Sequence, residues 1–314
     1  MTPGFLEATF IVGVLAGMLR VATPVLFAAL GELFTERSGV LNLGVEGCML
    51  VGGFMGFLVA FKTGSLWAGV AGSVAGGAAM GLIMAFMSST LKVDQIVTGL
   101  SLNLFASGIT FYWYRVAFRS SEIANIPTIA AFRPVKIPFL SDIPYLGEFL
   151  FSQYALTYIV LLMVPAIWFL LYRTKLGLHL RCLGENPRAL DMRGVNVTRL
   201  QYQAVIFGAA MAGLGGGFLT MVSVGLFVPG ITAGRGWLAL VMVIAGNWKP
   251  QGILGAALVF GFLESLQVNL QGIGQELPYQ IFLALPYVVA IILLISGRMR
   301  SEAPLSLGVP YHRE

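Results

Sequence analysis

The chain has 314 residues, of which 57% are hydrophobic and only 11% are charged. A soluble globular domain carries about 25% charged residues, so this composition excludes an ordinary soluble protein. The long apolar stretches are continuous rather than alternating, which favours membrane-spanning helices over a β-barrel. The net charge of +5 lies mostly in loops, and no folded basic surface is predicted that would bind nucleic acid.

Ten apolar segments follow one another along the chain. A full span needs about 20 residues, and the first, second and eighth segments are shorter, so we expect these three to be tilted, merged or re-entrant. The sequence thus predicts an all-α, polytopic transmembrane bundle with about 8–10 spans, some of them short or interrupted. The ten segments are 5–19, 21–34, 41–61, 65–91, 93–118, 153–172, 201–224, 236–248, 252–270 and 279–296.

Two polar, glycine-bearing stretches interrupt this pattern, one in each half of the chain. Glu36 to Gly47 separates the second and third segments, and Thr232 to Gly246 contains the short eighth segment. Each begins with a turn that contains Arg and Gly. Paired interruptions indicate an internal duplication with a translocation path at the interface of the repeats. Chance similarity in a chain with 39 glycines explains them nearly as well.

Five polar residues lie in or beside apolar segments, where burying an ionisable group in lipid is costly. Together they would suit a path for a neutral, hydrogen-bonding solute such as a nucleoside or a sugar. Two other roles stay open, because a buried amide often only joins helices and Glu46 can cap a neighbouring helix. The candidates for the translocation path are Asn42, Glu46, Asn103, Glu264 and Gln267.

The segment from Arg173 to Arg199 is the most basic part of the chain. It carries six Lys or Arg residues and two acidic residues between long apolar segments. A loop of this kind marks the cytoplasmic side of a membrane protein. Within it, Asn186 can cap a short helix and Pro187 suits the first helical turn. A membrane subunit that is driven by a soluble partner protein needs a polar helix of this kind as the site where that partner binds.

Counting crossings from this loop gives the expected orientation. Residues 1–300 form one transmembrane domain with 118–152 outside, and the polar tail 301–314 lies inside and is loosely ordered. Ten crossings place both termini in the cytoplasm. Arg20 is the weak point, because this count puts it outside. If the first two segments form one long helix, the N-terminus is outside instead.

Catalytic and metal-binding residues are not predicted. His179 and His312 are too few and too peripheral for a metal site. A His-Glu-x-x-His helix and a buried Ser–His pair are both missing from the sequence. Cys48 and Cys182 are expected to face different environments and to stay unpaired. The sequence therefore predicts neither an enzyme nor a bound cofactor.

Three stretches resemble the membrane subunits of bacterial ABC importers for branched-chain amino acids, ribose-type sugars and nucleosides. The first is most similar to the nucleoside and purine branch, whose members read GELFxERxGVLNLGxEG. The sugar branch usually has a GGIDLSVG-like sequence there, which is absent here. The three stretches are ALGELFTERSGVLNLGVEG at 29–47, GENPRALDMRGV at 184–195 and GNWKPQGILGA at 246–256.

The resemblance implies a permease subunit of an ATP-driven nucleoside importer in the plasma membrane of a prokaryote. It also implies three protein partners: an ABC ATPase that hydrolyses the ATP, a second, non-identical permease, and a substrate-binding lipoprotein. The 184–195 stretch corresponds to the coupling helix of the family. The residues that we expect to contact the ATPase are Glu185, Asn186, Arg188, Ala189 and Gly194.

Two alternatives to a nucleoside importer remain at this point. One is a sugar-specific permease of the same family. The other is an ion-coupled secondary transporter, for which Glu46 and Glu264 could supply the coupling carboxylates. The second alternative gives no reason for the Glu-Asn-Pro-Arg sequence in the basic segment.

Overall fold

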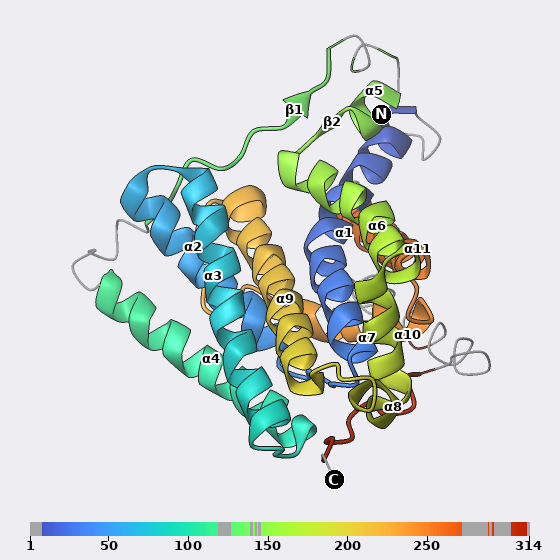
Figure 1. The fold of residues 1–314 in the computed structure, drawn as a ribbon. Helices are drawn as coiled ribbons and strands as arrows, with labels where there is room; N and C mark the ends of the chain where they lie inside the picture. The colour runs from blue at the N-terminus through green and yellow to red at the C-terminus, as the bar shows by residue number, and fades with distance from the viewer. Residues whose placement is uncertain are drawn as a thin grey trace.

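The computed structural model describes residues 8–118, 127–138, 141, 143, 146–271, 288, 291 and 303–312. These residues form a bundle of helices (Figure 1). Seven of the described helices are long and apolar enough to cross a membrane, which confirms the predicted all-α, polytopic bundle. The seven candidate spans are Phe10–Arg37, Val45–Thr63, Leu66–Thr90, Gln95–Ala117, Ala155–Arg173, Val197–Val224 and Pro250–Leu270.

The first helix differs from the ten-segment prediction. α1 (Ala8–Arg37) is one continuous helix of 30 residues, so the predicted division into 5–19 and 21–34 is wrong and the merged alternative holds. Arg20 lies inside this helix, and its Nε donates to Oε1 of Gln153 at 3.4 Å. The charged side chain in the middle of the helix therefore has a polar partner that is distant in sequence.

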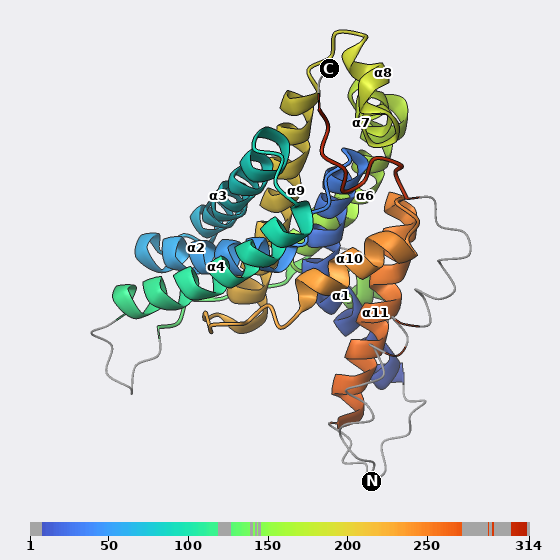
Figure 2. The ribbon, with the colours of Figure 1, turned by 90° about the horizontal axis from the view of Figure 1, so that it is seen from below.

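Three helices follow in the first half of the bundle. α2 and α3 pack closely side by side, whereas α4 contacts mainly α2 and leaves much of its apolar surface exposed (Figures 1 and 2). A short π-helical turn, η1, continues α3. The bounds are α2 (Val45–Thr63), α3 (Leu66–Ala85), η1 (Phe86–Thr90) and α4 (Gln95–Ala117).

The described part of the connection after α4 contains the only strands in the described ranges. β1 (Val135–Lys136) pairs antiparallel with β2 (Ser152–Gln153), and α5 (Leu146–Leu150) precedes β2. Figure 1 shows this connection at the same end of the bundle as the start of α1. α6 (Ala155–Arg173) then crosses to the other end.

The second half begins with the basic segment and returns through the centre of the bundle. α9 packs against α1, α2 and α3, and the contact is close because small residues face one another. A Cβ at Gly216 would lie 1.8 Å from the carbonyl oxygen of Met49, so only glycine fits there. The elements are α7 (Lys175–Glu185), α8 (Pro187–Asp191), α9 (Val197–Phe218), η2 (Leu219–Val224), α10 (Arg235–Ala245) and α11 (Pro250–Gln271).

α10 corresponds to the short eighth segment. With 11 residues it is too short to cross a bilayer, so the expectation of a short, interrupted segment is met here. The last predicted segment, 279–296, lies outside the described residues apart from 288 and 291.

The basic segment and the C-terminal tail lie at the same end of the bundle. We call the end that holds α7, α8 and the described tail 303–312 the basic end (Figures 1 and 2). Lys92 lies at this end too, because it lines a cavity together with Asp191 and Tyr311. The tail is packed rather than loosely ordered, which corrects the expectation from its polar sequence. Pro304 is buried, and Ser306 and Tyr311 both make hydrogen bonds to the basic segment.

Candidate functional site

The candidate site is built around the stretch that interrupts the first half of the chain. α1 ends at Arg37, and Gly39 turns the chain with φ of +81°, a value that favours glycine. Residues 38–44 then run without regular helix until α2 begins at Val45. The break leaves backbone amides and carbonyls inside an apolar bundle, where each needs a hydrogen-bond partner.

α4 supplies two of these partners through side-chain amides. Asn103 donates from Nδ2 to the carbonyl oxygen of Leu43 and accepts at Oδ1 from the N–H of Gly47, both at 2.8 Å. Gln95 accepts at Oε1 from the N–H of Leu41 at 2.7 Å. Asn103, a candidate for the path, is therefore bonded to the backbone of the break.

Asn42 is fully buried and is also engaged within the break. Its backbone N–H donates to Oε1 of Glu32 at 3.1 Å, and its own Oδ1 accepts from the N–H of Gly44 at 2.9 Å. Glu32, and Glu36 one turn later on α1, were not among the residues predicted for the site. Both carboxyl side chains are buried. Two acidic residues spaced by four within an apolar helix are the signal that could have revealed them.

Glu46 contacts the start of α10 rather than an open path. Its carboxylate accepts hydrogen bonds from the N–H of Gly234 at 2.9 Å and of Gly236 at 2.7 Å. A carboxylate at a helix N-terminus satisfies free N–H groups and is stabilised by the helix dipole. A Cβ at Gly236 would lie 2.5 Å from Cα of Glu46, so the approach requires glycine.

Arg235 joins the same turn to α11. Its Nη2 lies 2.8 Å from Oε1 of Glu264, and the two side chains are 24% and 22% exposed. Gln267 is half-buried and lies three residues further along α11. The structure therefore brings Glu46 and Glu264 to one turn, Gly234 to Gly236, whereas Asn42 and Asn103 bond to the break beside it.

The other end of α10 is fixed to the end of α1. The indole N–H of Trp248 donates to a carboxylate oxygen of Glu36, and Arg37 donates from Nη2 to the carbonyl oxygen of Trp248 at 2.9 Å. Trp248 is buried and has φ of +50°, which is unfavourable for a bulky residue. α10 is therefore held at both ends. Its start is bonded to α2 and α11, and the residues after its end are bonded to α1.

The basic segment forms the short helix that its sequence predicts. Asn186 Oδ1 accepts from the N–H of Ala189 at 3.1 Å, and Pro187 is the first residue of α8, which confirms the predicted cap and first turn. The five residues predicted to contact an ATPase are all exposed at the basic end: Glu185, Asn186, Arg188, Ala189 and Gly194.

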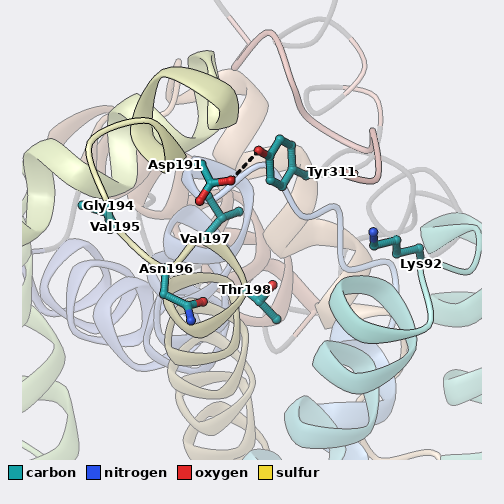
Figure 3. A pocket seen from close by; sticks show the side chains of 8 residues that line it. All are labelled: Lys92, Asp191, Gly194, Val195, Asn196, Val197, Thr198 and Tyr311. Carbon is teal, nitrogen blue, oxygen red and sulfur yellow. Dashed lines mark hydrogen bonds between the residues drawn. The ribbon is translucent and has the colours of Figure 1, made fainter. Parts of the chain in front are cut away.

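A polar cavity of about 300 Å³ lies between α8, the start of α9 and the tail (Figure 3). Tyr311 reaches across it, and its hydroxyl donates to Oδ2 of Asp191 at 2.9 Å. Lys92, at the turn before α4, lines the other side. Within the described residues, no cluster of His, Cys, Asp and Glu could hold a metal ion, and Cys48 and Cys182 are both free.

Comparison with known proteins adds the family to this geometry. The family model described as "branched-chain amino acid transport system / permease component" matches residues 14–295. The chain belongs to this family of ABC transporter permeases. This membership supports an ABC permease over an ion-coupled secondary transporter, because the relatives described next are named as ABC transporter permease proteins.

Three relatives match along nearly their whole length. A putative glucose ABC transporter permease protein of Haloferax volcanii is 36% identical over 98% of this chain and 99% of its own. A guanosine ABC transporter permease protein of Bacillus subtilis is 35% identical over 92% and 93%. A nucleoside ABC transporter permease protein of Lactococcus lactis is 32% identical over 95% and 96%. No solved structure matches the chain.

Proposed function

We propose that this permease moves a nucleoside of the purine class across the plasma membrane of a prokaryote as part of an ATP-driven importer. The observation that carries the proposal is the end-to-end similarity to permeases named for guanosine and for nucleosides. The stretch at 29–47, which is similar to the purine branch, contains the break around which the candidate site is built.

The electrostatics of the site support a neutral solute. Arg235 is paired with Glu264, and the carboxylate of Glu46 is bonded to two N–H groups at the start of α10. Charges that are paired or bonded in this way leave no net positive centre to attract an anion. A nucleoside offers hydroxyl and base groups that exchange hydrogen bonds with such a site. Gln267, one turn from Glu264, and the exposed edge of this ion pair are the contacts that we propose for the solute.

The basic end is the proposed cytoplasmic face, where a separate ABC ATPase binds. A basic connection between spans is retained on the cytoplasmic side of membranes. α8 lies there together with the residues that flank it. The proposed ATPase contact is formed by five exposed residues of α8 and its flanks: Glu185, Asn186, Arg188, Ala189 and Gly194. With this orientation the 118–152 connection and the start of α1 are external, and residues 301–314 are internal.

The remaining proposed partners are a second, homologous permease, which gives a heterodimer, and an external substrate-binding lipoprotein. Bacillus subtilis has two permeases named for guanosine, and both are similar to this chain, at 35% and 26% identity. This pairing of names supports two non-identical permeases in one transporter.

Sugar transport is the second candidate, because the glucose permease relative is as similar as the guanosine one. Purification of the tagged chain in mild detergent, followed by mass spectrometry of its partners, tests both candidates. We expect an ATPase, a second permease and a lipoprotein that binds nucleosides. A lipoprotein that binds glucose and not guanosine would favour the sugar candidate, and recovery of the chain alone would contradict the importer.

A further inference from the structure

The C-terminal segment 303–312 joins three parts of the basic end that are far apart in sequence. Ser306 donates from its backbone N–H to the carbonyl oxygen of Gly184 at 2.8 Å and from Oγ to that of Leu183 at 3.0 Å. Gly308 donates from its N–H to the carbonyl oxygen of Gly39 at 3.1 Å. The segment thus bonds to both the end of α7 and the turn after α1.

The end of α7 and the end of α1 are also in direct contact with each other. A Cβ at Gly184 would lie 2.6 Å from the carbonyl oxygen of Arg37, the last residue of α1, and 3.1 Å from Cβ of Pro304. The backbone of α7 therefore lies directly on the end of α1, and Pro304 of the tail packs at the same point of α7. Contacts of this closeness transmit displacement rather than absorb it, because packed protein interiors have low compressibility.

The last described residues of the segment reach α8 and the turn before α4. The Tyr311 hydroxyl bonds to Asp191, the final residue of α8, across the cavity in Figure 3. His312 Nδ1 lies 3.3 Å from Nζ of Lys92. Leu307 and Tyr311 also pack against the main hydrophobic core, so the segment is held by packing as well as by hydrogen bonds.

We propose that residues 303–312 clamp α7 and α8 to the end of α1, with Ser306 and Tyr311 as the positioning residues. The proposal rests on the proposed docking of an ATPase at α8. Without the clamp, a displacement of α8 would move only α7 and α8 and would not reach the end of α1. With it, the displacement reaches the break between α1 and α2, and through Glu46 and Trp248 it reaches both ends of α10.

The test uses the full transporter with two readouts. Spin labels at Met192→Cys and Val309→Cys, which are 84% and 60% exposed, report the distance between α8 and the segment. The exposed Cys182 is replaced by serine, and Cys48 is buried and stays unlabelled. We expect a narrow distance distribution in the parent and a broader one in Ser306→Ala/Tyr311→Phe. In that variant, solute moved per ATP hydrolysed should fall at least threefold while the ATPase stays bound.

The matched control is Ser107→Ala/Tyr112→Phe, which removes the same atoms from exposed side chains on α4. It should leave both readouts unchanged. An unchanged distance distribution, an unchanged transport-to-ATP ratio or loss of ATPase binding in the clamp variant would each overturn the proposal. If the parent complex moves no solute at all, the proposed function fails, and the distance measurement still decides whether the clamp exists.

Discussion

Glu46 on α2 accepts a hydrogen bond of 2.7 Å from the backbone N–H of Gly236 at the start of α10. The two residues are 190 positions apart and belong to the two interrupted stretches of the chain. Since Gly234 donates to the same carboxylate, one side chain terminates a short helix inside an apolar bundle.

Glu46→Gln should destabilise the protein by about 1.5–3 kcal/mol, the usual worth of hydrogen bonds to a charged group. An amide offers one acceptor oxygen, and its NH₂ group would face an N–H donor. The melting temperature of the purified chain in detergent is the measurement. Glu185→Gln, at an exposed position on α7, is the control and should leave it unchanged. Equal melting temperatures for both variants would mean that the junction contributes no stability.

Gly236→Ala should be more harmful than an alanine elsewhere in a helix. Its Cβ would lie 2.5 Å from Cα of Glu46, and relieving such overpacking costs about 1–3 kcal/mol. Gly255→Ala on α11 is the matched control, because a Cβ there meets nothing within 4 Å. The control should be neutral or stabilising by up to about 1 kcal/mol. Thermal unfolding of the two variants side by side gives the comparison, and an unaffected Gly236→Ala protein would contradict the close approach.

Arg235 and Glu264 should behave as a coupled pair in a double-mutant cycle. Arg235→Gln or Glu264→Gln alone leaves a partly buried charge unpaired, whereas the double variant removes both charges. We expect the double variant to be more stable than the sum of the single effects by about 0.5–3 kcal/mol. Solute uptake should fall in all three variants because the ion pair borders the proposed contact for the solute. Additive stability effects would show that the two side chains do not interact.

Trp248→Phe keeps an aromatic ring at the end of α10 but removes the indole N–H that donates to Glu36. The carboxyl group is buried, so losing its partner should cost about 1–3 kcal/mol. Trp67→Phe is the control, since Trp67 is more than half exposed at the start of α3. Melting temperatures would again be compared, and a loss no greater than that of the control would argue against this bond.

Arg188→Glu should leave the transporter assembled in the membrane but make ATP hydrolysis independent of substrate. The substitution reverses a charge on the exposed face of α8, where we propose that the ATPase binds. Lys136→Glu, on the exposed strand β1 at the other end of the bundle, is the matched charge reversal. Stimulation of hydrolysis by solute and lipoprotein is measured for both. Normal stimulation in Arg188→Glu would refute the coupling role of this residue.

Local features of the chain were predictable, and contacts between distant segments were not. The Asn186 cap and Pro187 first turn depend on neighbouring residues only, and the structure has both. Arg20 interrupts the apolar run of α1, so hydropathy alone divided this helix, and the hydrogen-bond partner of Arg20 is 133 positions away. The tail looked unstructured for the same reason, since Ser306 and Tyr311 find their partners on α7 and α8.

The polar residues of the candidate site show the same division. Asn42, Glu46, Asn103 and Glu264 were predictable as unusual residues, because placing a polar side chain in lipid costs free energy. Periodicity and spacing could not predict which groups they bond to. The structure gives each a hydrogen-bonding partner: the backbone of the break for the two asparagines, the N-terminus of α10 for Glu46, and Arg235 for Glu264.

The most direct test of the account is uptake by the purified transporter, with its ATPase and lipoprotein, in sealed proteoliposomes. Labelled guanosine and labelled glucose would be supplied separately on the lipoprotein side, with ATP on the ATPase side. We predict ATP-dependent accumulation of guanosine that unlabelled nucleosides inhibit and glucose does not. Accumulation of glucose without guanosine, or guanosine movement that does not need ATP, would contradict the account.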